Sequence, residues 1–167
     1  EDLRINLNLG MDYAKSGGFS ETPAGSEQSL HSTAQSGSGY HSDYTYERMD
    51  KTLELYADYN KDFNEAHHFD AMLGYSWQQF YSKSSDYSYK LTDGAVLSEN
   101  NPAGELFLVS FFGRANYSYD NRYMVTATVR RDGSSKFQGK NRWGIFPSVA
   151  LGWNIANEEF LKDNETL

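Results

Sequence analysis

The fold is decided by residues 108–153, which read LVSFFGRANYSYDNRYMVTATVRRDGSSKFQGKNRWGIFPSVALGW. Apolar side chains recur here at every second position, in three successive runs: Val109, Phe111, Ala115, Tyr117 and Tyr119, then Tyr123, Val125, Ala127 and Val129, then Trp143, Ile145, Val149, Leu151 and Trp153. A repeat of two is typical of β-strands that have one apolar face and one polar face. The stretch therefore predicts three consecutive strands of a sheet.

The same alternation occurs earlier in the chain, so that six strands are expected in all: residues 2–13, 44–60, 67–82, 106–119, 122–132 and 143–156. Strands of globular proteins have about five or six residues. Twelve to fourteen residues span roughly 40 Å, or about 30 Å along the axis when tilted by ~40°, which crosses the ~25 Å apolar band of a membrane barrel. The sequence predicts an all-β, antiparallel up-and-down meander of six long strands.

The connections between these strands alternate in length. Residues 14–43 and 83–105 are expected to form long loops, because they are rich in Gly, Ser and other turn-forming residues. Short turns are expected at 61–66 and 120–122. Long extracellular loops that alternate with short periplasmic turns are typical of bacterial outer-membrane barrels.

The composition of the 167 residues narrows the function. A net charge of −8 argues against a nucleic-acid partner, and the absence of cysteine removes disulfides, zinc–thiolate sites and thiol catalysis. Aromatic residues make up 16% of the chain, yet the mean hydropathy is −0.73. A lipid-facing barrel has this combination, because each outward apolar residue alternates with a polar one. A soluble, carbohydrate-binding β-sandwich on the cell surface remains the alternative.

The sequence resembles that of the SusC/RagA family of TonB-dependent outer-membrane transporters. The resemblance is carried by Ser110–Tyr119, Arg131–Phe137 and Trp143–Trp153, and more weakly by residues 52–77. It implies an internal fragment of a 22-stranded transmembrane barrel, without the plug domain. It also implies a location in the outer membrane of a Gram-negative, Bacteroidetes-like cell.

The resemblance further implies a function and its partners. The intact protein would import glycan oligomers or peptides through the outer membrane, with a SusD-like surface lipoprotein as its lid and with energy delivered by the TonB complex through parts missing from this chain. The chain opens directly in a strand pattern at Glu1, so we expect it to be a piece of a longer polypeptide.

No enzyme, cofactor or metal site is expected. A hydrolase built on Asp132 and Ser134 would need a base, and no histidine lies near them in the sequence. His31 and His41 are weak metal candidates because they lie ten residues apart in a Gly/Ser-rich segment. The pair Glu158-Glu159 is expected to be a solvated turn.

Aromatic residues of the two expected long loops are the candidate functional residues. They are Tyr40, His41, Tyr44, Tyr87 and Tyr89. Their rings could stack on sugar rings or pack against a partner protein. The alternative is that these residues only shield the mouth of the barrel.

Overall fold

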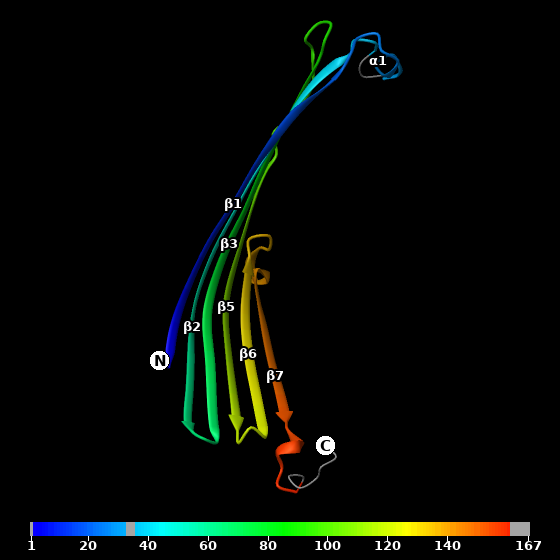
Figure 1. The fold of residues 1–167 in the computed structure, drawn as a ribbon. Helices are drawn as coiled ribbons and strands as arrows, with labels where there is room; N and C mark the ends of the chain where they lie inside the picture. Colours follow the sequence, from blue (N-terminus) through cyan, green and yellow to red (C-terminus); the bar gives the residue numbers. More distant parts are fainter. Residues whose placement is uncertain (1, 33–35, 161–167) are drawn as a thin grey trace. The chain divides into compact units, whose positions relative to one another are not determined.

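The computed structural model describes residues 2–32 and 36–160, so residues 33–35 of the first expected loop lie outside the described part. Seven strands form one sheet in the order β1-β2-β3-β5-β6-β7, and β4 pairs with β3 (Figure 1). The strands are β1 (Leu3–Thr22), β2 (Tyr40–Asn64), β3 (His67–Lys90), β4 (Val96–Asn100), β5 (Ala103–Tyr119), β6 (Tyr123–Ser134) and β7 (Trp143–Trp153). Short helical segments are α1 (Glu27–His31), η1 (Gly139–Arg142) and η2 (Ile155–Asn157). The predicted meander of six long strands is confirmed, with β4 as a short addition.

The two long loops predicted at 14–43 and 83–105 are wrong in their bounds, because strands occupy both ends of the first segment and most of the second. β1 continues to Thr22 and β2 begins at Tyr40, whereas β3 continues to Lys90 and is followed by β4 and then by β5 from Ala103. The three strands β1, β2 and β3 have 20, 25 and 24 residues, longer than the predicted spans 2–13, 44–60 and 67–82. The predicted bounds of the last three long strands, 106–119, 122–132 and 143–156, lie within three residues of those observed.

The predicted loops are too long because glycine and proline are usual turn signals, whereas several of these residues have specific roles in or beside the strands. A Cβ atom at Gly17 would lie 3.0 Å from the carbonyl oxygen of Tyr44, and one at Gly18 would lie 2.6 Å from the Tyr44 hydroxyl. These glycines let the neighbouring strand approach closely and do not end β1. Pro102, which has no N–H, separates β4 from β5, and its carbonyl accepts a hydrogen bond from the Ser84 amide at 2.9 Å.

The registers of β5, β6 and β7 place the odd-numbered residues of these strands on one face. Phe111 lies opposite Arg131, which lies opposite Ile145, and the rows continue at intervals of two residues to Tyr119, Tyr123 and Trp153. The tight turn after Tyr119 uses Asp120 and Asn121 with φ of 53° and 51°, and Arg122 N donates to Tyr119 O at 2.9 Å. Asp and Asn tolerate this left-handed conformation, and the turn fits the twist of the hairpin.

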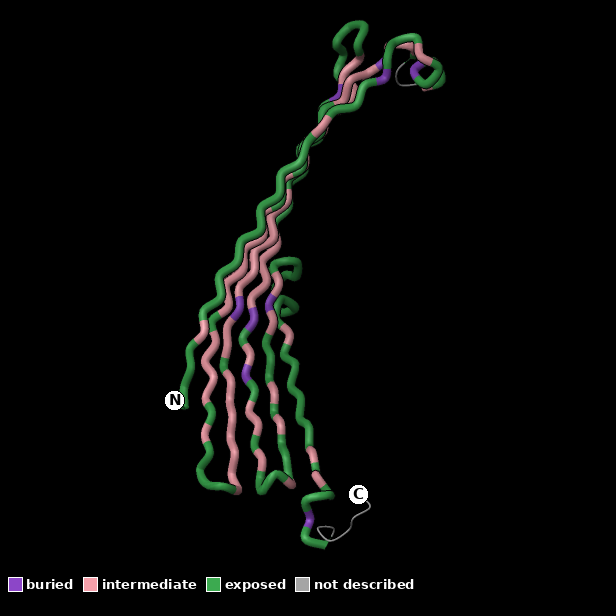
Figure 2. The backbone as a smooth tube through the Cα atoms, viewed as in Figure 1, coloured by how far each residue is buried: buried purple, intermediate pink, exposed green. Residues whose placement is uncertain are grey.

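The apolar face of the sheet is exposed. Among the described residues no hydrophobic side chain is buried, and many large hydrophobic residues are 37–79% exposed (Figure 2). The six residues predicted to share this face are all exposed: Leu7, Leu55, Leu73, Phe111, Val125 and Val149. A β-sandwich would bury them in a core between two sheets. The open sheet therefore excludes the soluble sandwich and leaves an apolar surface suited to lipid.

Even-numbered residues carry the polar contacts of the opposite face. Asn6 donates to Asp58 at 2.9 Å, and Asn116 donates to Asp70 and accepts from Thr126, both at 2.7 Å. These bonds join neighbouring strands through side chains. A polar, hydrogen-bonded face is expected of the wet or protein-filled interior of a large barrel.

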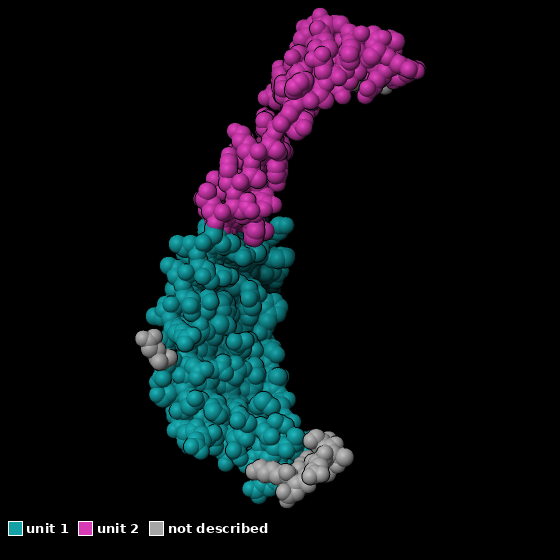
Figure 3. All heavy atoms as spheres, viewed as in Figure 1, with its two compact units in different colours: residues 1–10, 52–78, 107–167 teal, residues 11–51, 79–106 magenta. Residues whose placement is uncertain are grey.

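The chain divides into two compact units (Figure 3). Unit 1 comprises residues 1–10, 52–78 and 107–167, and contains the whole of β6 and β7. Unit 2 comprises residues 11–51 and 79–106, and contains α1 and β4. Within residues 2–32 and 36–160, no helix is long and apolar enough to cross a bilayer.

Candidate functional site

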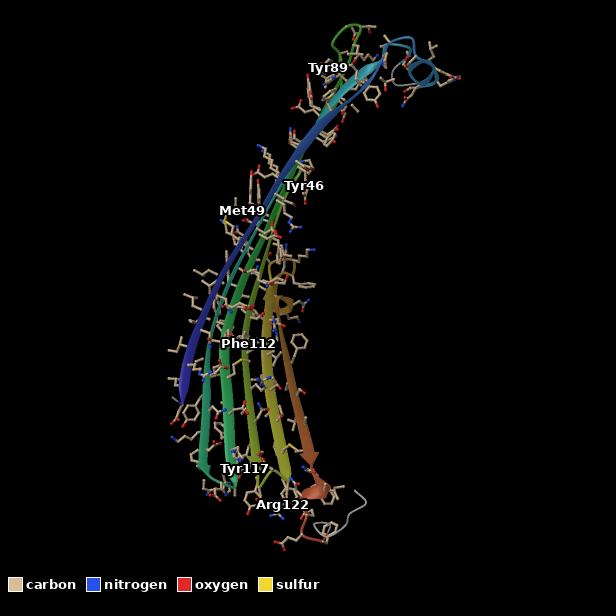
Figure 4. All side chains as sticks on the ribbon, in the orientation of Figure 1. Tyr46, Met49, Tyr89, Phe112, Tyr117 and Arg122 are labelled. Atoms are coloured by element: carbon tan, nitrogen blue, oxygen red, sulfur yellow. The ribbon has the colours of Figure 1, made fainter. Side chains whose placement is uncertain are left out.

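All five predicted site residues lie in unit 2, on strands and not on loops. Tyr40, His41 and Tyr44 belong to β2, and Tyr87 and Tyr89 belong to β3. Figure 4 shows Tyr89 near the end of β3, close to the turn that leads to β4. Rigid pairing of the strands therefore positions these side chains, which a flexible loop would not do.

Three of the predicted residues meet in a row of aromatic rings that spans three strands, called the stack below. The ring of His41 lies between Phe19 of β1 and Tyr89 of β3, with centroid separations of 5.4 and 5.3 Å and interplanar angles of 12° and 30°. Tyr87 continues the row, 6.0 Å from Tyr89. Phe19 was missed because it follows two glycines inside the expected loop. The odd numbering of all four residues is the signal that could have found it.

Two carboxylates hold the ring of His41 from opposite sides. Nδ1 lies 3.1 Å from Glu21 Oε2, and Nε2 lies 3.3 Å from Asp43 Oδ1. A carboxylate only accepts hydrogen bonds, so both contacts are best satisfied when both ring nitrogens carry protons. The hydrogen bond to Glu21, and next the one to Asp43, raises the pKa of His41 above its ordinary value of 6.5. When both nitrogens are protonated, the ring is a cation stacked between two aromatic faces.

Tyr40 and Tyr44 do not join this stack. Both are even-numbered residues of β2 and so point to the face opposite His41. Tyr44 instead lies against Gly18. Among the described residues neither tyrosine makes a ring contact with the stack. Of the five predicted residues, the structure thus brings His41, Tyr87 and Tyr89 together.

The arrangement does not suit a metal ion. Glu21 and Asp43 bind opposite nitrogens of His41, so the three groups do not converge on one point. His31 lies in α1. No group of three or more metal-ligating side chains occurs in the part of the chain that the structure describes.

The hydrolase alternative also lacks its geometry. Both oxygens of Asp132 accept from Arg130 Nε, at 2.7 and 3.0 Å, and Ser134 Oγ accepts from the amide of Lys136 at 3.3 Å. These contacts belong to a strand end and a turn.

Glu158 is not part of a solvated turn, as was expected, but is almost buried against the hairpin of β5 and β6. Its carboxylate accepts from the hydroxyl of Tyr123 at 2.6 Å, from Trp153 Nε1 at 3.0 Å and from Arg122 at 3.2 Å. The hydrogen bonds from Tyr123 and then Trp153 lower the pKa of Glu158. The segment after β7 is further fixed by Asn157, which donates to the Asn121 carbonyl at 3.1 Å. A sequence pattern does not show these contacts, because the partners lie up to 36 residues apart.

Comparison with known proteins supplies the remaining findings. The sequence pattern of the family described as TonB dependent receptor-like, beta-barrel, matches residues 1–161. The chain is 36% identical to TonB-dependent receptor SusC of Bacteroides thetaiotaomicron over 99% of its own length, and 37% identical to TonB-dependent receptor P3 of Formosa agariphila over 95%. It spans 17% of the length of each of these relatives.

Solved structures show the same fold. The RagAB peptide transporter matches 96% of the chain with a TM-score of 0.82 and 21% identity. The RagAB peptide importer in the closed-closed state matches 98% with a TM-score of 0.84 and 23% identity. Each match covers 19% of the solved chain.

Proposed function

The chain belongs to the TonB-dependent receptor-like β-barrel family, and we propose that it forms part of a transporter that imports oligomeric nutrients, oligosaccharides or peptides, across the outer membrane. The family places the chain in the outer membrane and among transporters, not enzymes. The observation that carries the proposal is the open sheet of long strands with one exposed apolar face and one hydrogen-bonded polar face. Such a sheet is stable only when lipid covers one side and further strands close the barrel.

The partners follow from the same premise. The intact protein works with a SusD-like surface lipoprotein and draws energy from the TonB complex through segments outside this chain. Support for a lipoprotein lid comes from the SusC relative and from the RagAB fold. Peptide transport is named for RagAB, whereas the rings of the stack suit sugar as well as peptide contacts.

The stack of Phe19, His41, Tyr87 and Tyr89 is the proposed contact surface for substrate or lid. Flat rings held by three paired strands offer a large contact area at little conformational cost. Tyr40 and Tyr44, on the opposite face, would contact a different part of the transporter's interior or surface.

Uptake in cells that carry the full-length transporter tests this assignment. Replacing both His41 and Tyr89 by alanine should lower uptake of the substrate or co-purification of the lipoprotein, while the amount of folded barrel in the membrane stays normal. Tyr46→Ala is the matched control, because Tyr46 is an exposed tyrosine of β2 outside the stack. Unchanged uptake and unchanged lipoprotein binding in the double variant would show that the stack only supports the strands. Supplying labelled oligosaccharides and peptides separately distinguishes the two substrate classes.

A further inference from the structure

The apolar face of unit 1 contains a hollow of about 580 Å³. Residues of β1, β2, β3, β5 and β6 line it, among them Leu55, Ala57, Leu73, Phe111 and Val129. The lining includes the small residues Ala57 and Gly113, and the side chain of Leu73 lies over Gly113. The lining is almost wholly apolar, with one charged residue at its edge, Arg131.

Arg131 is unusual on this face. The odd-numbered residues of the strands in unit 1 include two Lys or Arg side chains among the described residues, Lys61 and Arg131. Lys61 is paired with Asp2, whereas Arg131 lies in β6 among apolar and aromatic residues. Its guanidinium lies 4.7 Å from the ring centroid of Trp143, and it has no hydrogen bond or ion pair with any described residue. An arginine on a lipid-facing surface normally has a counter-charge or reaches the interface.

Its neighbour Arg130 shows the contrast. Arg130 points to the opposite face, where Asp132 accepts from its Nε at 2.7 Å and Ser110 accepts from its terminal nitrogen at 3.0 Å. The charge of Arg130 is therefore paired within the protein. Arg131 has no such partner among the described residues, so its charge is available to a group outside them.

The position of Arg131 along β6 places it near the outer edge of the membrane. It lies eight residues from Tyr123, which is about 21 Å along the axis for a strand rise of ~3.4 Å and a tilt of ~40°. The apolar band is about 25 Å tall, and Trp143, opposite Gly133, lies about 5 Å further out. The short hairpin turn at 120–122 is at the other, periplasmic end of these strands. The backbone of Arg131 thus lies about 4 Å inside the outer edge of the apolar band, from where its long side chain can reach the headgroups of the outer leaflet.

We propose that this surface is a binding site for a phosphate-bearing membrane lipid, whose phosphate pairs with Arg131 beside Trp143 and whose acyl chain occupies the hollow next to Ala57 and Leu73. A guanidinium matches phosphate with two parallel hydrogen bonds, and little water competes at this depth. An acyl chain in the hollow makes dispersion contacts with the apolar lining. Without it, the lining atoms would lack packing partners on that side. The inference rests on the outer-membrane location in the proposed function, but it does not depend on what is transported.

Lipid binding to the full-length protein tests the proposal. Purified transporter in a neutral detergent is titrated with phosphatidylglycerol, and bound lipid is counted by native mass spectrometry. Arg131→Gln should weaken the tightest binding about tenfold, as expected for loss of one charge-assisted pair. Ala57→Phe, which fills the hollow while keeping Arg131, should also weaken it. Arg114→Gln removes the same charge from the opposite face and should leave the affinity unchanged.

The controls separate this proposal from the transport function. Equal affinity of the wild type and Arg131→Gln would overturn the site, as would an equal loss in Arg131→Gln and Arg114→Gln, which would indicate a general charge effect. Phosphatidylcholine is titrated in parallel. Its affinity should differ less between wild type and Arg131→Gln, because its phosphate is paired with its own choline. An affinity difference as large as that for phosphatidylglycerol would overturn the role of the anionic headgroup. Substrate uptake is measured separately, so that a failure of transport leaves the lipid result interpretable.

Discussion

A charge placed at mid-depth on the apolar face should destabilise the barrel strongly, whereas the same charge one residue away should not. Val149 is 70% exposed and lies opposite Ala127, four residues from Trp153. Four residues correspond to about 10 Å along the axis from the Trp153 row, close to the middle of a ~25 Å apolar band. Val149→Arg should therefore cost about 2–4 kcal/mol, the range for arginine at the midplane.

Two matched variants show whether depth and face set this cost. Ser148 is adjacent to Val149 but points to the polar face, so Ser148→Arg should cost much less. Leu151 lies on the apolar face only two residues, or about 5 Å, from the Trp153 row, so Leu151→Arg should cost an intermediate amount.

The assay is guanidinium unfolding of the full-length protein refolded into phospholipid vesicles, followed by tryptophan fluorescence. A cost of about 2–4 kcal/mol lowers the ratio of folded to unfolded protein by roughly 30- to 900-fold. The unfolding midpoint should fall in the order Ser148→Arg, Leu151→Arg, Val149→Arg. If Ser148→Arg destabilises as much as Val149→Arg, the assignment of the odd-numbered face to lipid is wrong.

Three further outcomes are expected. The pKa of His41 is raised by Glu21 and Asp43, so its contribution to stability is complete below its unfolded pKa and is lost as pH rises through the folded one; NMR of histidine-labelled transporter should show a titration midpoint above 6.5, and Glu21→Gln should lower it. The pKa of Glu158 is lowered, so its contribution is present above its ordinary pKa of 4.5 and is lost as pH falls through the folded value; Glu158→Gln should change the fluorescence of Trp153 near neutral pH, whereas Glu159→Gln should not. The isolated chain should aggregate in water and need detergent, because β1 and β7 are edges of the open sheet; a monodisperse monomer in plain buffer by sedimentation would contradict this.

The sequence alone determined the architecture of β5, β6 and β7. Apolar residues recur at the odd-numbered positions of these strands, with a few even-numbered exceptions such as Phe112, Met124 and Phe146, so the period of two defines both the strands and their faces. The turn at Asp120 and Asn121 was also predictable from local sequence, because these residue types accept a positive φ. The family resemblance followed from this same stretch.

The tertiary structure alone decided how far the first strands extend and which side chains meet. Gly17 and Gly18 have low strand propensity, yet they belong to β1 because the backbone of β2 supplies hydrogen-bond partners and Tyr44 fills the space above them. His41, Phe19 and Tyr89 come together only through the pairing of three strands, and Glu158 reaches Tyr123 only because the segment after β7 folds back on a hairpin. Local propensity reports the preference of each residue for its own backbone, whereas these contacts depend on strand register between distant segments, which no local pattern encodes.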